Sequence, residues 1–120
     1  MRSSVDKKRI QILKKQLSLA KACGYTVKTE KTADPWPYNP NNTLMEIAAK
    51  VYKEQNGTDV DLIAVHAGLE CGTFAVYNPK LMMICIGPDV KDVHTPQETL
   101  TLGSVPKIYN LLKGILQSVE

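Results

Sequence analysis

The residues that could do chemistry are concentrated in two short segments of the 120-residue sequence. The first segment, HAGLECG at 66–72, places an imidazole, a carboxylate, a thiol and two glycines in one turn. The second segment, IGPDVKDVHTPQE at 86–98, contains His94 and several carboxylates. Each segment follows a short apolar run, and in open α/β sheets ligands and catalytic groups collect in loops at the carboxyl ends of strands. The two segments are therefore the candidate functional site.

Each of these signals also has an ordinary structural explanation. Gly68 suits a simple strand-to-helix turn as well as a close approach of the backbone to an anion. Glu70 is typical of a solvated first-turn carboxylate that the helix dipole stabilises. A neutral His94 imidazole could coordinate a metal or hydrogen-bond a substrate, but two histidines and scattered acids do not form the three-ligand set of catalytic zinc. From spacing alone, the structural explanations are favoured.

The elements that must position these segments alternate between helix and strand. Apolar residues three or four apart predict amphipathic helices, and short apolar or alternating runs predict strands. The predicted helices are 5–22, 43–56 and 105–119, with a helical turn early in 68–79. The predicted strands are 25–30, 60–65 and 81–86. This order predicts an α/β fold with a helix-flanked sheet.

The sequence also predicts helix ends and buried faces. Thr43 and Glu46 form a capping-box pair for the second helix, and Asn56-Gly57 ends it. Ser104 can cap the last helix, in whose first turn a proline is tolerated. The predicted buried stripe of that helix is Val105, Ile108, Leu112, Ile115 and Val119.

Composition excludes several classes of protein. A chain with 43% hydrophobic and 22% charged residues is a soluble globular domain rather than a disordered one. Its net charge of +3 is far below that of a nucleic-acid-binding tail, and no apolar run approaches the ~20 residues that cross a bilayer. Cys23, Cys71 and Cys85 lack a C-x-x-C spacing, which predicts reduced thiols in a cytoplasm. We expect Cys71 and Cys85 to be buried.

Three strings together resemble one known family. HAGLECG at 66–72, IGPDVKDVHTPQE at 86–98 and PWPYNPNNTLMEIAAKVY at 35–52 are similar to the C-terminal part of the aminoacyl-histidine dipeptidases, also called cytosol nonspecific dipeptidases. These are two-zinc metallopeptidases related to carnosinases and aminoacylases. The resemblance implies that 35–120 is the C-terminal α/β part of a catalytic domain. It implies that 1–34 is the closing helix and strand of a lid domain.

The resemblance also implies roles for individual residues. His94 matches the C-terminal histidine that ligates one zinc of the pair. Arg2 matches an arginine that holds the substrate carboxylate, a task that suits a bidentate guanidinium. Gly68 and Glu70 match residues that line the substrate pocket, where Glu70 would meet the amino group of the substrate. No residue of this chain matches a catalytic base.

The implied activity is hydrolysis of dipeptides of the Xaa-His type by a metal-activated water, with two zinc ions, or manganese or cobalt, per active site. The other metal ligands and the general base of the family have no match here, so we expect the chain alone to be inactive and to bind no metal tightly. The chain departs from the pattern of the family at two places, and neither removes His94, the matched ligand. Thr95-Pro96-Gln97-Glu98 stands where the family usually has S-P-D-E, and Met82 stands where an aspartate is common. We expect a cytoplasmic homo-oligomer with a dipeptide substrate.

Two other functions stay open. The chain could be a non-catalytic module that self-associates through apolar strands or helix faces that lack cover. It could instead bind nucleic acid through the lysine-rich helix at 7–21, although no aromatic side chains are interleaved with those lysines. We expect neither a nucleic-acid partner nor a membrane partner.

Overall fold

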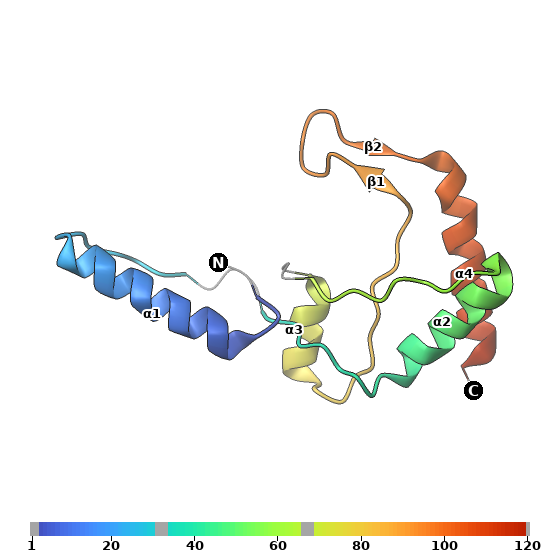
Figure 1. Ribbon diagram of the computed structural model, residues 1–120, viewed down its shortest axis with the longest axis horizontal. Coiled ribbons are helices and arrows are strands. Elements are labelled where there is room, and N and C mark those ends of the chain that lie inside the picture. Colours follow the sequence, from blue (N-terminus) through green and yellow to red (C-terminus); the bar gives the residue numbers. More distant parts are fainter. Residues whose placement is uncertain (1–2, 31–33, 66–68, 120) are drawn as a thin grey trace. The chain divides into compact units, whose positions relative to one another are not determined.

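The computed structural model describes residues 3–30, 34–65 and 69–119. Within these ranges the elements are helices and one small antiparallel hairpin (Figure 1). They are α1 (Asp6–Ala22), α2 (Thr43–Asn56), α3 (Glu70–Tyr77), β1 (Val90–Lys91), β2 (Thr99–Leu100), the 3₁₀-helix η1 (Leu102–Ser104) and α4 (Val105–Ser118). None of the described helices is long and apolar enough to span a membrane.

The chain divides into two compact units, Met1–Pro40 with Leu62–Leu81, and Asn41–Asp61 with Met82–Glu120. The first unit contains α1 and α3, and the second contains α2, the hairpin and α4. The second unit holds the buried apolar residues and the hairpin that carries His94. The division into a lid part at 1–34 and a catalytic part at 35–120 stays a prediction.

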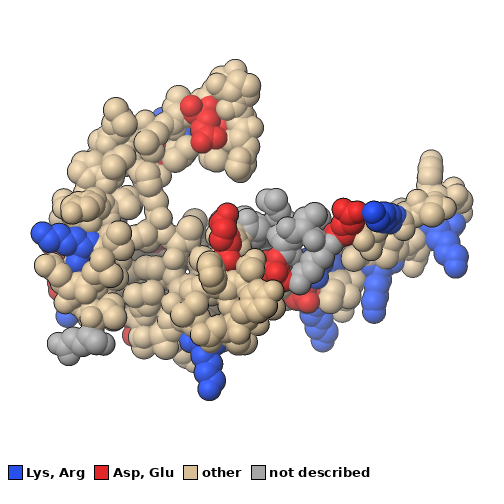
Figure 2. All heavy atoms as spheres, turned by 180° about the vertical axis from the view of Figure 1, so that it is seen from behind, with Lys and Arg blue, Asp and Glu red and all other residues tan. Residues whose placement is uncertain are grey.

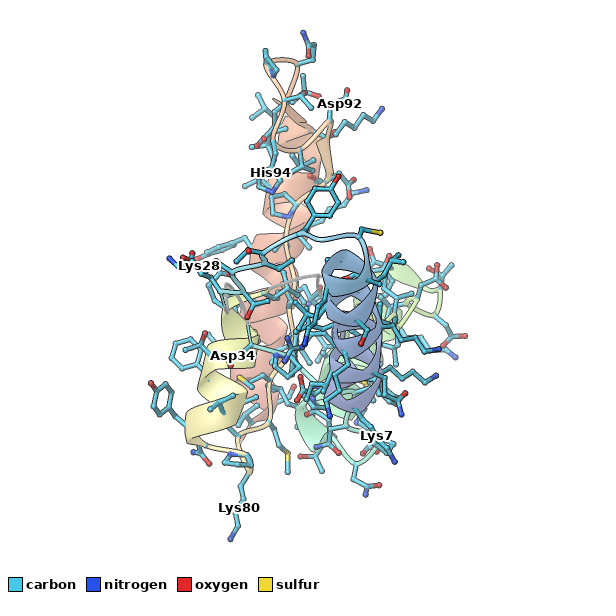
Figure 3. The ribbon with its side chains drawn as sticks, turned by 90° about the vertical axis from the view of Figure 1, so that its left-hand side faces the viewer. Lys7, Lys28, Asp34, Lys80, Asp92 and His94 are labelled. Carbon is cyan, nitrogen blue, oxygen red and sulfur yellow. The ribbon has the colours of Figure 1, made fainter. Side chains whose placement is uncertain are left out.

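Helix α1 confirms the amphipathic helix predicted at 5–22. Its first turn is stabilised by Arg9, whose Nε donates to Asp6 Oδ1 at 2.8 Å, and Gly24 follows the helix with a left-handed φ of 78°. Lysine side chains project from the helix (Figure 2), and Lys7 is labelled in Figure 3. No residue of α1 is buried, however, so its apolar stripe is only partly covered.

Helix α3 confirms the predicted helical turn, and Gly72 explains how it packs in its unit. A Cβ at Gly72 would collide with the carbonyl oxygen of Asp34, which directly precedes the proline-rich string PWPYNP at 35–40. Only a residue without a side chain allows the backbone of that segment to approach the helix so closely. Gly72 is accordingly buried.

The core of the second unit lies between α2 and α4. Ala48 and Val51 of α2 meet Leu111 and Ile115 of α4 as a cluster of buried apolar side chains. A Cβ at Gly114 would lie 2.5 Å from Val51 Cγ1, so this glycine lets the two helices approach closely. Partly buried side chains extend the cluster: Leu44, Ile47, Tyr52, Ile84 and Ile108.

The capping of α2 differs from the prediction by one residue. Asn42, not Thr43, is the N-cap, and its Oδ1 accepts a 3.4 Å hydrogen bond from the Met45 N–H. Asn42 is buried, and its Nδ2 also donates to the Met83 carbonyl at 2.8 Å. This bond satisfies the buried amide and holds the start of α2 to the segment after α3. The predicted end is confirmed, since Gly57 is the left-handed C-cap with a φ of 74°.

The buried face of α4 is also shifted relative to the predicted stripe. Ile115 is buried and Ile108 is partly buried, as predicted, but Val105, Leu112 and Val119 are exposed. Leu111 is buried in their place. The reason is that α4 carries apolar residues on two faces, and the described structure covers only the face that contacts α2.

The predicted strands do not form ladders within the described residues. Segments 25–30, 60–65 and 81–86 contain no strand in the described chain, although all three lie outside the helices. A strand exists by pairing its N–H and C=O groups with a neighbour, and the only ladder among the described residues is the short β1–β2 pair. Ile63 is 80% exposed, as expected for an apolar strand without its sheet.

Candidate functional site

His94 lies at the tip of the hairpin formed by β1 and β2. The strands pair antiparallel, with Val90 opposite Leu100 and Lys91 opposite Thr99. The loop that joins them, residues 92–98, corresponds to the second chemistry-bearing segment of the sequence. The structure therefore places His94 in a short closed loop rather than in an irregular connection.

The base of the hairpin is held to the start of α4 by Ser104. Its Oγ accepts from the Asp89 N–H at 2.8 Å and donates to the Thr101 carbonyl at 2.6 Å. The Thr101 N–H in turn donates to the Asp89 carbonyl at 2.9 Å. Ser104 was predicted to cap α4, but the structure shows no such capping bond. It is buried because it satisfies the hairpin instead.

The loop is organised by hydrogen bonds of Thr95. Its Oγ1 donates to the Asp92 carbonyl at 2.7 Å and accepts from the Gln97 N–H at 3.2 Å. Its N–H donates to the same Asp92 carbonyl at 3.2 Å, and its carbonyl accepts from the Glu98 N–H at 3.1 Å. Threonine and serine both form turns of this kind, which explains why Thr95 can stand where the resembled family has serine.

The backbone of the loop is left-handed at two residues that carry a Cβ. Asp92 has a φ of 52° and His94 has a φ of 67°. The His94 N–H donates to Glu98 Oε2 at 2.7 Å, and both side chains are exposed. Figure 3 shows Asp92 and His94 on this loop. Left-handed conformations at residues with a Cβ cost of order 1–3 kcal/mol and persist where the surrounding structure fixes them.

The other predicted site residues lie in the other compact unit or outside the described residues. Glu70 is the exposed first residue of α3, where it suits the positive end of the helix dipole, and it belongs to the other compact unit. Arg2 and Gly68 lie outside the described residues. The structure therefore tests none of the three proposed substrate contacts.

The described residues do not make a complete metal site. No group of three or more His, Cys, Asp or Glu side chains among them could hold a metal ion. Glu98, the acidic residue bonded to His94, uses one of its carboxylate oxygens on the backbone N–H. A catalytic zinc needs about three protein ligands, so the described residues alone do not supply its full ligand set.

The cysteines do not contribute a site either. Cys85 is exposed and Cys71 is only half-buried, which corrects the prediction that both are buried apolar residues. Cys85 lies in the predicted strand 81–86, whose exposure follows from the missing strand partners. Cys23 follows α1 and is exposed as well. None of the three cysteines forms a disulfide in the structure.

Sequence reasoning missed the roles of Glu98 and Ser104. In the sequence Glu98 is only part of the string that follows His94, and Ser104 is predicted only as a helix cap. The available signal was the Thr95-Pro96 pair, which predicts a tight turn after the histidine and so brings residue 98 back toward residue 94. The pairing of Asp89 with Ser104 has no such local signal.

Comparisons with known proteins agree over almost the whole chain. Residues 4–118 match Peptidase family M20/M25/M40. The cytosol non-specific dipeptidase of Escherichia coli (strain K12) is 27% identical over 119 residues, which cover 99% of this chain and 24% of that protein. The crystal structure of aminoacylhistidine dipeptidase from Vibrio alginolyticus is similar with a TM-score of 0.77 and 25% identity, over 98% of this chain and 24% of that one. The chain thus spans about a quarter of the length of these relatives.

Proposed function

Because the chain belongs to Peptidase family M20/M25/M40, we propose that it is the C-terminal segment of a zinc-dependent dipeptidase whose substrates include dipeptides of the Xaa-His type. The observation that carries the proposal is the closed hairpin loop that presents His94, in a chain similar along its whole length to two dipeptidases. We also propose a cytoplasmic location, since the Escherichia coli relative is a cytosol non-specific dipeptidase.

In this proposal the residues of the chain bind zinc and orient the substrate. His94 would ligate one of two zinc ions through its imidazole, Arg2 would hold the substrate carboxylate, Glu70 would meet the substrate amino group, and Gly68 would line the substrate pocket. When bound, zinc supplies an activated water and polarises the scissile carbonyl. The remaining ligands and the general base would come from the part of a dipeptidase that this chain does not match.

The exposed surface supports the proposal that the chain alone is inactive. It exposes 9760 Å², whereas two separate compact bodies of half its mass would together expose roughly 7,800 Å². Large apolar side chains such as Ile63, Leu102 and Leu116 are more than half exposed. In this proposal such side chains are covered by the part of a dipeptidase that this chain does not match, and the described residues form no complete metal site.

Zinc binding by the purified chain tests the proposal. Structural sites with four ligands bind zinc with about 10–16 kcal/mol, so one imidazole contributes about 2.5–4 kcal/mol, which corresponds to a Kd of about 1–15 mM. We expect titration calorimetry to show this weak binding, to show its loss in His94→Ala, and to find no dipeptide hydrolysis with zinc or manganese. Submicromolar stoichiometric binding that His94→Ala abolishes would contradict inactivity, because it would mean a complete site.

A self-associating, non-catalytic module is the second candidate, and the outer face of α4 favours it. Val105, Leu112 and Leu116 lie on that face with 41%, 45% and 67% exposure. Their spacing of seven and four residues forms a continuous helical stripe of the kind that pairs with another helix. In this candidate the stripe is the surface that contacts a second copy of the chain.

Light scattering after size-exclusion chromatography distinguishes this candidate. We expect the chain to form dimers whose fraction rises with concentration and falls at least tenfold in Leu112→Glu, because the charge would be buried at the contact. Gln117→Glu, an equal change of charge on an exposed polar residue of α4, is the matched control. A monomer at all concentrations would exclude self-association.

A further inference from the structure

The backbone conformation of His94 needs a specific cause. Its φ of 67° lies in the left-handed region, which residues with a Cβ rarely adopt. Since φ and ψ set the direction of the Cα–Cβ bond, this conformation determines where the imidazole points. An extended His94 would point its ring elsewhere, even with the same hairpin register.

Glu98 supplies that cause. Its Oε2 accepts the His94 N–H at 2.7 Å, at the short end of the range for N–H to oxygen hydrogen bonds. The other hydrogen bonds of the loop join Thr95 to Asp92, to Gln97 and to the Glu98 backbone N–H, and they close the turn beside His94 without bonding its amide. Among the described residues, the carboxylate of Glu98 is the group that holds the amide of His94 itself.

We propose that Glu98 is the positioning residue of His94: by accepting the backbone N–H, its carboxylate holds the histidine in the left-handed conformation that presents the imidazole. Glu98 is neither a metal ligand nor a catalytic residue in this proposal. The role of His94 as a zinc ligand rests on the proposed function, whereas the control of its conformation by Glu98 does not.

Nuclear magnetic resonance of the full chain tests the inference. A left-handed residue brings its amide proton close to its own α-proton, so His94 should give a strong intraresidue amide to α-proton NOE. Its amide resonance should lie downfield because the hydrogen bond is short. We expect Glu98→Ala to weaken this NOE at least twofold and to move the amide upfield. Glu98→Gln, which keeps an oxygen acceptor, should retain the NOE.

The controls separate this effect from a general loss of the hairpin. Gln97→Ala removes the side chain of a neighbouring residue but keeps its backbone N–H, which donates to Thr95 Oγ1. The His94 signals should therefore stay unchanged. The Val90 to Leu100 cross-strand NOEs report the hairpin and should persist in every variant. Unchanged His94 signals in Glu98→Ala would overturn the inference. A Glu98→Gln that behaves as Glu98→Ala would also overturn it, since the acceptor alone would then be insufficient.

A zinc titration in the same experiment distinguishes the inference from the proposed function. Zinc-dependent shifts of the His94 imidazole nitrogens in the unmodified chain support the ligand role. Their absence up to several millimolar zinc would overturn that role, while the NOE of His94 would still decide whether Glu98 fixes its conformation.

Discussion

A chimera in which residues 4–118 replace the matching quarter of the Vibrio alginolyticus aminoacylhistidine dipeptidase is expected to hydrolyse dipeptides, and His94→Ala in this chimera is expected to lower kcat/KM by about 10³-fold. The match covers 98% of this chain with a TM-score of 0.77, so the segment should fold in place of its counterpart. Losing a ligand weakens a metal that stabilises the transition state by several kcal/mol, and about 4 kcal/mol corresponds to this loss of rate.

The matched control for this chimera is Val93→Ala. Val93 precedes His94 in the same loop, has an exposed side chain and offers no metal-binding atom. We expect Val93→Ala to keep activity within about threefold, and atomic absorption to find reduced zinc content only in His94→Ala. An active His94→Ala chimera with full zinc content would refute the ligand role of His94. The fold of each variant is checked by circular dichroism.

The helices of this protein could be predicted from sequence because the forces that define them are local. The apolar spacing in 6–22 and 43–56, and the glycines that follow each helix, act within a few residues of one another. The error of one residue at the cap of α2 has a non-local cause. Asn42 is favoured over Thr43 because it also bonds the Met83 carbonyl, 41 residues away.

The strands could not be predicted as paired elements, since pairing depends on residues distant in the sequence. The apolar runs 60–65 and 81–86 have strand-like composition but no ladder among the described residues. The ladder that does form joins only Val90–Lys91 to Thr99–Leu100, which is too short to produce an alternating pattern. Composition therefore indicated β character without indicating which residues pair.

The candidate site was only partly predictable, for a similar reason. His94 could be identified from a family resemblance, while its spacing alone favoured an ordinary surface histidine. The left-handed backbone and the bond to Glu98 depend on how the loop closes, which periodicity does not report. Glu70 was predicted in the same way, and the structure adds only its place at the start of α3.

Replacing Leu111 by alanine is expected to destabilise the second unit by about 2–4 kcal/mol. Leu111 is 6% exposed and contacts the small cluster formed by Ala48, Val51 and Ile115. Removing a buried leucine side chain costs its transfer free energy plus the cavity that remains. This loss is a large share of the about 5–15 kcal/mol by which native proteins are stable.

Leu116→Ala is the matched control, because it makes the same chemical change on the same helix at a side chain that is 67% exposed. We expect it to change the free energy of unfolding by less than about 0.5 kcal/mol. Urea unfolding followed by the amide signals of α2 and α4 measures both variants at a protein concentration where the chain is monomeric.

With a slope of about 1 kcal/mol per molar, the midpoint of Leu111→Ala should fall by about 2 M or more. Equal midpoints would mean that α4 does not pack on α2 through its Leu111 face, and a larger loss in Leu116→Ala would mean that the outer face carries the stability.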